Sequence, residues 1–252
     1  MAKVIAYVNE KGGVGKSSVC FNVAWYLATE ENKRVLMIDM DGQRANLTFF
    51  AGIDKPSNLA TIYDVLVDDL DVKKTVLVVE DNLHIIPATA DVAGLTPENG
   101  SPAKMQRIIK ELDPYYDLIF IDVSPSPNGH IHALAVADGI VIPMLPDITS
   151  LEANMGIIES IKYVRAKINP KLRVLGIAMN RFTLRARLSS DVADMAEQMA
   201  AAMQTKVFKT KIRQAVALSE NVGQNIGITS YIKGGAADDF RKLSKEILQE
   251  VE

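Results

Sequence analysis

A glycine-rich segment near the amino terminus carries the residues best suited to bind phosphate groups. It runs Lys-Gly-Gly-Val-Gly-Lys-Ser-Ser over 11–18, after an apolar run and before a segment of helical periodicity. Glycines let backbone N–H groups approach phosphate oxygens, and the positive end of the following helix adds to the attraction. The Lys16 ammonium would contact the β- and γ-phosphates, and the Ser17 hydroxyl would be a Mg²⁺ ligand. The predicted nucleotide-binding loop comprises Lys11, Gly12, Gly13, Val14, Gly15, Lys16, Ser17 and Ser18.

Two apolar runs of the sequence end in aspartate. Val35–Ile38 leads into Asp39 and Asp41, and Leu118–Ile121 leads into Asp122. The carboxyl ends of parallel strands form the edge of an open α/β sheet where ligands bind. A single aspartate at such a place could merely cap the next turn. Two such runs together with the glycine-rich loop predict a site for a nucleotide and its metal ion.

These residues require a sheet that brings them to one edge. Short apolar runs alternate with longer segments of helical periodicity, and most of the apolar runs are nearly continuous, as in strands buried on both faces. This alternation predicts an α/β fold, a three-layer, doubly wound and mostly parallel sheet. The predicted strands are Val4–Val8, Val35–Ile38, Leu83–Ile86, Leu118–Ile121, Gly139–Met144, Leu175–Met179 and Lys206–Ile212. The predicted helices are Lys16–Thr29, Leu59–Val67, Pro102–Leu112, Ile131–Ala137, Ser150–Lys167, Leu188–Met203 and Ala236–Val251.

Length and composition limit the architecture. The chain has 252 residues, of which 48% are hydrophobic and 23% charged, and this fits one domain over 1–252. Its single cysteine, Cys20, excludes an internal disulfide and favours a reducing compartment. The sequence has no run of about 18 uncharged apolar residues that could span a membrane. The region 51–82 is the least regular and is expected to be a surface excursion.

The glycine-rich loop departs from the usual P-loop pattern in a way that resembles a known family. The pattern G-x-x-x-x-G-K-[ST] requires glycine where this chain has Glu10, and a second lysine, Lys11, stands at the front. This arrangement resembles the deviant Walker A motif of the ParA/MinD family of P-loop NTPases. The resemblance implies ATP and Mg²⁺ as cofactors, and a homodimer in which Lys11 reaches the partner's nucleotide. Lys11 would there stabilise transition-state charge as an arginine finger does, and before dimerisation it is expected to be a solvated surface lysine.

The aspartates also match motifs of this family. Asp39-Met40-Asp41 resembles its second motif, and the run that ends in Asp122 resembles its Walker B strand. The resemblance implies that Asp41 positions the attacking water, that Asp122 holds Mg²⁺ through water, and that Asp39 supports the metal shell or its loop. The predicted catalytic residues are Lys11, Lys16 and Asp41, and the predicted metal-site residues are Ser17, Asp39 and Asp122. Gly42 stands where the family usually has proline and could loosen the loop of Asp41, which favours slow hydrolysis. The resemblance implies that a partner protein stimulates this hydrolysis.

The resemblance continues through the second half of the chain and omits only about 51–82. Ala135–Pro143 is similar to the family's A-x-A-D-x-V-I-I-P segment. Val207–Glu220 resembles the V-F-x-T-x-I-P…L-S-E region of Soj-type members, with Arg213 in place of proline. Asn180 matches the asparagine that contacts the adenine ring in the family. Its carboxamide suits the adenine edge, although an asparagine at the end of a strand could instead stabilise a loop.

Positive charge is concentrated locally in a chain whose formal net charge is −3. No acidic residue occurs between Ser160 and Ser190. That stretch and the next basic segment contain Lys162, Arg165, Lys167, Lys171, Arg173, Arg181, Arg185, Arg187, Lys206, Lys209, Lys211 and Arg213. On one face these cations would form a salt-sensitive footprint for DNA of any sequence, and otherwise they are solvated helix faces. ParA-like proteins bind nonspecific DNA as ATP dimers, although Ala217 fills one of the family's usual basic positions.

The preferred function is an ATP-dependent, dimerising ATPase that binds nonspecific DNA and partitions or positions a plasmid, chromosome or mobile element. Its expected partners are a second copy, nonspecific DNA and a ParB-like or other adaptor protein, and its expected place is the cytoplasm, on the nucleoid. No membrane is expected, because the tail 238–252 is acidic and its apolar residues suit docking on the domain. The alternatives are a MinD-like or other ATPase that positions a protein or membrane cargo, and an ATP-binding switch with negligible hydrolysis. Iron–sulfur and tyrosine-kinase relatives would need interface cysteines or a terminal tyrosine cluster.

Overall fold

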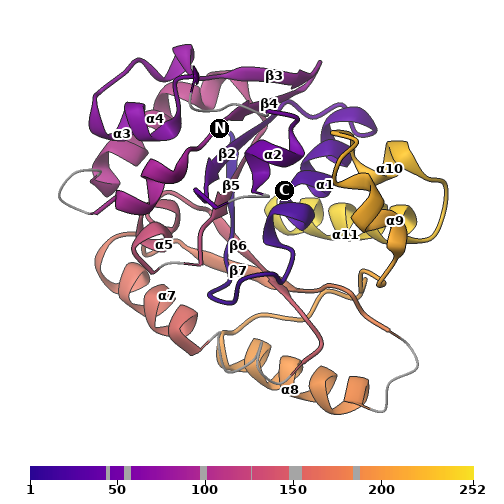
Figure 1. Cartoon of the computed structure of the whole chain (residues 1–252). Coiled ribbons are helices and arrows are strands. Elements are labelled where there is room, and N and C mark those ends of the chain that lie inside the picture. The colour runs from indigo at the N-terminus through magenta and orange to yellow at the C-terminus, as the bar shows by residue number, and fades with distance from the viewer. Residues whose placement is uncertain (44–45, 54–57, 97–100, 126, 148–154, 184–187) are drawn as a thin grey trace.

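A single sheet organises the structure. The computed structural model describes residues 1–43, 46–53, 58–96, 101–125, 127–147, 155–183 and 188–252. Within these ranges, seven strands form one sheet in the order β3-β4-β2-β5-β1-β6-β7, in which only the β3–β4 pairing is antiparallel. This confirms the predicted mostly parallel α/β sheet (Figure 1). The strands are β1 (Lys3–Tyr7), β2 (Val35–Met40), β3 (Leu77–Glu80), β4 (Leu83–Ile86), β5 (Leu118–Val123), β6 (Gly139–Met144) and β7 (Arg173–Met179).

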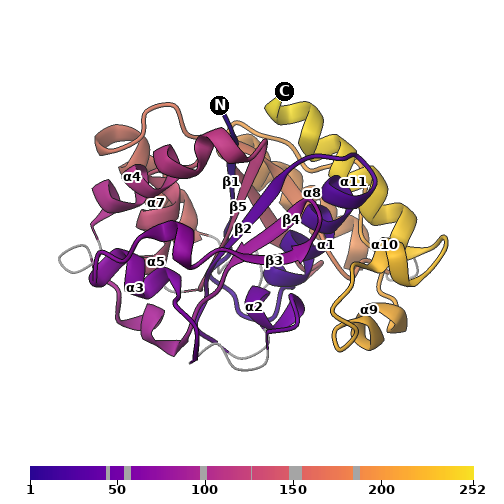
Figure 2. The ribbon, with the colours of Figure 1, turned by 90° about the horizontal axis from the view of Figure 1, so that it is seen from above.

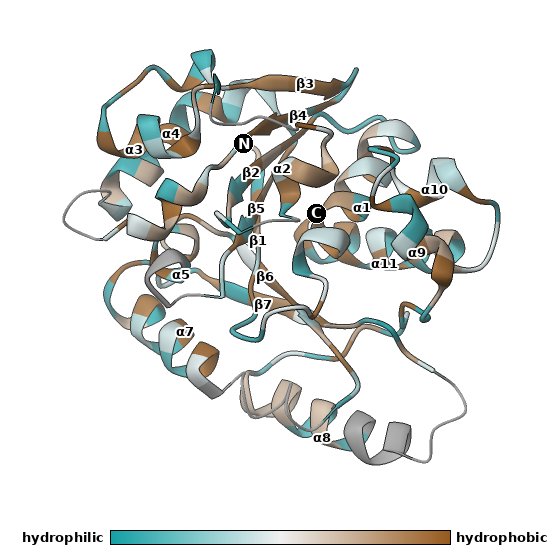
Figure 3. Cartoon of the chain, in the orientation of Figure 1, coloured by the Kyte–Doolittle hydropathy of each residue, from teal (hydrophilic) through white to brown (hydrophobic). Residues whose placement is uncertain are grey.

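Helices cover both faces of the sheet and complete the three predicted layers. One layer contains α1 and α11, and the other contains α3, α4, α5 and α7 (Figure 2). Hydrophobic residues follow the central strands, whereas the outer helices alternate between hydrophobic and hydrophilic residues (Figure 3). The helices are α1 (Lys16–Thr29), α2 (Leu47–Phe50), α3 (Ile62–Val67), α4 (Pro102–Leu112), α5 (Pro127–Leu134), α7 (Met155–Lys167), α8 (Leu188–Ala202), α9 (Val216–Asn221), α10 (Ile228–Tyr231) and α11 (Ala236–Val251).

The strand register brings the two acidic strand ends together. Every residue of β2 and β5 is buried, which explains why both read as continuous apolar runs. These strands are neighbours, and Asp39 of β2 pairs with Asp122 of β5. On the other side of β5, Tyr7 of β1 also pairs with Asp122. The chain leaves β1 at this same edge and enters the glycine-rich loop.

One predicted strand, Lys206–Ile212, is wrong. The segment has no strand of its own and makes one isolated bridge, between Val207 and Ile177 of β7. Two of its backbone N–H groups, those of Lys209 and Thr210, donate to the Glu246 carboxylate of α11. Bonding to β7 resumes only at Ile212, whose N–H donates to the Met179 carbonyl, so the carboxylate interrupts what would otherwise be a continuous β-ladder. The apolar side chains that suggested a strand, Phe208 and Ile212, are buried although the segment forms no strand.

The region 51–82 is more regular than expected. It contains α3 and the antiparallel edge strand β3. Helix α3 begins at Ile62 rather than Leu59, because Thr61 and Asp64 form a capping box at its start. Strand β3 has only four residues at the edge of the sheet, and every second side chain is exposed, Val78 by 74%, unlike the fully buried strands that were predicted.

Other helix boundaries shift by a few residues. Helix α5 covers Pro127–Leu134 instead of the predicted Ile131–Ala137, and α8 ends one residue early, at Ala202. Helix α7 begins at Met155, and the first five residues of the predicted 150–167 helix lie outside the described residues. The helices predicted after the glycine-rich loop, at 102–112 and at the carboxyl terminus have the predicted bounds.

The carboxyl-terminal helix docks on the domain as predicted. Its residues Phe240, Leu243, Ile247 and Val251 recur at helical spacing, are buried, and join the core cluster that contains α1. The Arg241 guanidinium adds ion pairs to Glu30 and Asp238. No helix in the described part of the chain combines the length and the apolar character that crossing a bilayer requires.

Candidate functional site

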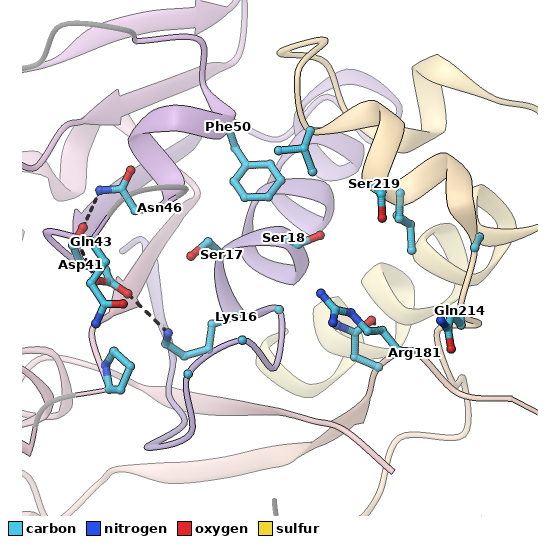
Figure 4. Close-up of a pocket in the computed structure, with 18 of the residues that line it drawn as sticks. Lys16, Ser17, Ser18, Asp41, Gln43, Asn46, Phe50, Arg181, Gln214 and Ser219 are labelled. Atoms are coloured by element: carbon cyan, nitrogen blue, oxygen red, sulfur yellow. Dashed lines mark hydrogen bonds and ion pairs between the residues drawn. The ribbon is translucent and has the colours of Figure 1, made fainter. Parts of the chain in front are cut away.

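A cavity of about 630 Å³ opens at the carboxyl edge of the sheet. Its floor is the glycine-rich loop with the first residues of α1. Asp41, Gln43 and Asn46 lie on one side of this floor, and Arg181, Gln214 and Ser219 lie on the other (Figure 4). All of the predicted loop residues except Lys11 and Val14 therefore line one cavity with Asp41, and this cavity is large enough for a nucleotide.

The glycine-rich loop has the backbone geometry that phosphate binding needs. Gly13 and Gly15 have φ values of 77° and 88°, the left-handed region that favours glycine. Gly15 is the N-cap of α1, so the first N–H groups of the helix face the cavity. A Cβ atom on Gly15 would lie 2.3 Å from Nδ2 of Asn180, which leaves no room for a side chain. The adjacent Val14 is buried.

Asn180 braces this loop from the end of β7. Its Nδ2 donates to the Val14 carbonyl at 2.8 Å, and its Oδ1 accepts from the Arg181 backbone N–H at 3.0 Å. These bonds are those of the loop-stabilising alternative. Each end of the carboxamide keeps a second hydrogen-bonding position, so the predicted adenine contact stays a prediction.

Lys16 and Asp41 face one another across the phosphate-binding part of the cavity. Nζ of Lys16 lies 3.6 Å from Oδ2 of Asp41, and the two side chains are 7% and 8% exposed (Figure 4). The Asp41 backbone is also held: its N–H donates to Oδ1 of Asp39, and its carbonyl accepts from Nδ2 of Asn46. A positive and a negative group therefore stand side by side above the glycine-rich loop.

Gly42 is required by close packing. A Cβ atom at this position would lie 2.7 Å from the carbonyl oxygen of Thr89 and 2.9 Å from Cα of Ala90. We expected Gly42 to loosen the loop of Asp41. The structure shows instead that the absence of a side chain lets this loop pack closely against the backbone of Thr89 and Ala90.

We expect Gly42→Ala to lower the free energy of unfolding by about 1–3 kcal/mol, the usual cost of forcing an extra methyl group into a packed place. Denaturant unfolding followed by circular dichroism measures this loss. Gly223→Ala is the matched control, because a Cβ atom on Gly223 meets nothing within 4 Å. Equal stability of the two variants would contradict the packing argument.

The buried carboxylates of Asp39 and Asp122 differ in their partners. Oδ2 of Asp39 accepts hydrogen bonds from the backbone N–H and the hydroxyl of Thr48, both in α2. Neither oxygen of Asp122 has a hydrogen-bond partner within the described part of the chain. Asp39 therefore organises the following helix, whereas Asp122 presents unpartnered oxygens.

The electrostatics of this pair fit a bound cation. Burial, and then the proximity of Asp122, raises the pKa of Asp39 well above its ordinary value. Burial also raises the pKa of Asp122, while the nearby Lys16 ammonium and Ser17 hydroxyl oppose that rise. A divalent cation would offset the cost of keeping both carboxylates ionised. A carboxylate and a serine hydroxyl are also hard oxygen donors of the kind that Mg²⁺ prefers.

Lys11 differs from the solvated lysine that was expected. Its Nζ lies 2.8 Å from Oδ1 of Asp147, in the segment after β6, and its side chain is 27% exposed. Its backbone N–H donates to Oδ1 of Asn9 at 2.7 Å. In the single chain, Lys11 thus forms an ion pair instead of standing in solvent.

Two residues that position Asp41 escaped the sequence prediction. Asn46 caps α2 by accepting from the Phe49 N–H, and Thr48 fixes Asp39. The signal was present, since an asparagine directly before a short apolar run is a helix N-cap pattern. The other side of the cavity was missed as well, although Gln214 and Ser219 lie within the segment Val207–Glu220 that resembles Soj-type proteins.

The loop that follows β5 is tied to both neighbouring elements. The Ser124 N–H donates to the Met40 carbonyl at 3.2 Å, next to Asp41. Nε2 of the buried His130 donates to the Ser124 carbonyl at 3.0 Å, and burial lowers the pKa of this imidazole. These bonds hold Pro125 at the cavity wall.

Comparison with known proteins agrees with this geometry. The model of the AAA domain family matches residues 2–174. The chain is 34% identical to the chromosome-partitioning ATPase Soj of Thermus thermophilus, over 98% of this chain and 96% of the relative. It is also 34% identical to the sporulation initiation inhibitor protein Soj of Bacillus subtilis, over 98% of each chain. Among solved structures, the septum site-determining protein MinD of Pyrococcus horikoshii complexed with Mg-ADP aligns with a TM-score of 0.78 and 25% identity, over 98% of this chain and 96% of that chain. The chain therefore belongs to the Soj/ParA family of partitioning ATPases with an AAA domain.

Proposed function

We propose that the chain, acting as one domain over 1–252, binds ATP with Mg²⁺, dimerises around it, and hydrolyses it slowly until an adaptor protein accelerates turnover. The Lys16–Asp41 pair carries this proposal, because it sets a phosphate-binding cation opposite a carboxylate that can orient water. The Mg-ADP in the MinD relative and the names of the Soj relatives support it. Cytoplasmic, nucleoid-associated action is part of the proposal.

The positions of the residues support the roles that we propose for them. Lys16 and the N–H groups at the start of α1 bind the phosphates, and Asp41 orients the attacking water. Ser17 would bind Mg²⁺ directly and Asp122 through a water molecule, while Asp39 keeps α2 and the Asp41 loop in place. When bound, Mg²⁺ would neutralise negative charge that develops on the phosphates. In the dimer, Lys11 would add a second cation to the partner's site.

We further propose that the ATP-bound dimer binds DNA of any sequence through exposed basic side chains. The structure divides the basic stretch: Lys167 and Lys171 lie before β7, whereas Arg181 follows it at the nucleotide cavity. Some of the cations have internal acidic partners, such as Lys206 with Glu250. Arg185 and Arg187 lie outside the described residues.

Exposed lysines without an internal partner are the best candidates for phosphate contacts. Lys167 and Lys171 are exposed and have no ion pair within the described ranges. We expect Lys167→Ala and Lys171→Ala each to weaken binding of nonspecific duplex DNA and to reduce the slope of log K against log salt by about one. Fluorescence anisotropy with ATP, ADP or no nucleotide over a salt series measures both quantities.

Lys206→Ala is the matched control for this experiment, because Glu250 already neutralises its ammonium. It should change the salt slope less than the other two variants. Tight binding only with ATP would support a nucleotide-dependent DNA switch. Absence of binding in every nucleotide state would overturn the DNA proposal and favour a protein cargo for the same ATPase.

A further inference from the structure

The segment 206–213, here called the strap, is held by an acidic stripe on α11. The stripe consists of Asp239, Glu246 and Glu250, which lie seven and four residues apart and therefore share one helical face. Glu250 pairs with the Lys206 ammonium at the beginning of the strap. Glu246 accepts from the N–H groups of residues 209 and 210 at 2.8 and 2.9 Å. On the side of the strap that faces away from β7, the carboxyl-terminal helix thus provides the hydrogen-bond acceptors that a further strand would provide.

The strongest of these contacts is at the end of the strap. Asp239 accepts three hydrogen bonds from Arg213: from the backbone N–H at 3.1 Å, from Nε at 2.6 Å and from Nη2 at 2.8 Å. The Asp239 side chain is only 8% exposed, whereas that of Arg213 is 56% exposed. A bidentate guanidinium–carboxylate pair fixes geometry more strictly than a point contact. Arg213 therefore anchors both its side chain and its backbone to α11.

The other side of the strap is attached to β7. The Phe208 N–H donates to the Ile177 carbonyl at 2.9 Å, and the Ile212 N–H donates to the Met179 carbonyl at 2.8 Å. Both strap side chains are buried. The strap is consequently held on one side by the edge of the sheet and on the other by α11.

The anchored residue adjoins the side of the cavity opposite Asp41. Gln214 follows Arg213 directly, and the wall continues through residues 215, 216, 218, 219 and 222. The Gln214 N–H donates to the Phe182 carbonyl, next to Arg181 on the same wall. In Figure 4, Gln214 and Ser219 face the cavity from the side remote from Asp41 and Asn46. This is where the part of a nucleotide beyond its phosphates would lie.

We propose that the Arg213–Asp239 pair is a positioning device for this wall, so that α11 sets nucleotide affinity and Arg213 is not a DNA contact. The identity of the ligand rests on the proposed function above. The charge of Arg213 suits DNA binding at first sight. However, the nearly buried Asp239 carboxylate accepts hydrogen bonds from both the guanidinium and the backbone N–H of Arg213. Without Arg213, that carboxylate would keep a buried charge with little compensation.

Titration with a fluorescent ATP analogue and Mg²⁺ tests this proposal. We expect Arg213→Ala and Asp239→Asn each to raise the dissociation constant about tenfold, equivalent to about 1.4 kcal/mol. Turnover at saturating ATP should stay within about twofold of the parent chain, because the wall contacts no reacting atom. Binding of DNA at saturating nucleotide should also be unchanged in Arg213→Ala. The matched control is Asp238→Asn, which removes the neighbouring carboxylate that pairs with Arg241 instead.

A charge swap distinguishes positioning from general destabilisation. Arg213→Asp combined with Asp239→Arg restores an ion pair and should recover at least part of the lost affinity, which neither single substitution does. Thermal unfolding with and without nucleotide shows whether each variant is folded at the assay temperature. If Asp239→Asn alone is unfolded, Arg213→Ala and the charge swap decide.

Two results would overturn the proposal: unchanged nucleotide affinity in folded Arg213→Ala, or weakened DNA binding with unchanged nucleotide affinity. Failure of the parent chain to bind the ATP analogue would instead refute the proposed function. The same titration thus separates the two failures.

Discussion

Asp41→Ala is expected to bind ATP and to lose hydrolysis, with a fall in kcat of about 100-fold or more, in the range typical of a removed catalytic group. The Asp41 carboxylate pairs with Lys16 over the phosphate-binding loop and accepts one hydrogen bond, from the Gln43 N–H at 3.1 Å. The backbone of this residue keeps its bonds to Asp39 and Asn46, since neither involves the carboxylate. The variant should therefore fold normally and bind nucleotide at least as tightly, because Lys16 no longer has an internal counter-charge.

Phosphate release under single-turnover conditions, together with nucleotide titration, separates binding from chemistry. Asp91→Ala is the matched control, since it removes an exposed carboxylate from a neighbouring segment, where Oδ2 accepts a hydrogen bond from the Thr89 hydroxyl. Normal turnover in Asp41→Ala would show that another group positions the water. Loss of nucleotide binding would show instead that the carboxylate has a structural role.

Much of the site could be predicted because its residues follow strands that are buried on both faces. The runs before Asp39 and Asp122 are continuous and apolar, and the order of parallel strands places both ends at one edge. The helix after the glycine-rich loop was equally predictable. Gly13 and Gly15 before it adopt the left-handed backbone conformation, which glycine accepts far more readily than other residues. Local pattern and global position agree in these elements.

The elements that were missed depend on contacts between distant residues. Helix α2 has four residues, too few to be stable on propensity alone, and Thr48 joins it to Asp39. The strap has the apolar residues of a strand but gives its N–H groups to α11. Lys11 and Asp147 are 136 residues apart in the chain, so no local pattern could connect them. Each of these errors concerns a polar contact that forms only after the sheet is assembled.

The Lys11–Asp147 ion pair competes with the role that we propose for Lys11 in dimerisation. We expect Lys11→Ala to remove ATP-dependent dimerisation while the monomer still binds ATP through Lys16. A lysine that reaches a partner's nucleotide must first leave Asp147, to which it now lies at 2.8 Å. The two side chains are 27% and 38% exposed, and a partly exposed pair of this kind contributes only about 0–1 kcal/mol. Opening it is therefore a small cost compared with contact to a triphosphate.

Light scattering after size-exclusion chromatography, with ATP and with ADP, measures the dimer directly, and the Asp41→Ala background prevents loss of ATP during the run. Asp147→Asn is the informative companion, because it weakens the competing ion pair and keeps Lys11. It should dimerise with ATP at least as readily as the parent, whereas Lys11→Ala should remain monomeric at concentrations at least tenfold above the parent's dimer dissociation constant. Dimers of Lys11→Ala that form as readily as those of the parent would refute the role of Lys11 in the partner's site. If Asp147→Asn also failed to dimerise, the carboxylate would be part of the interface, and the ion pair would support assembly instead of competing with it.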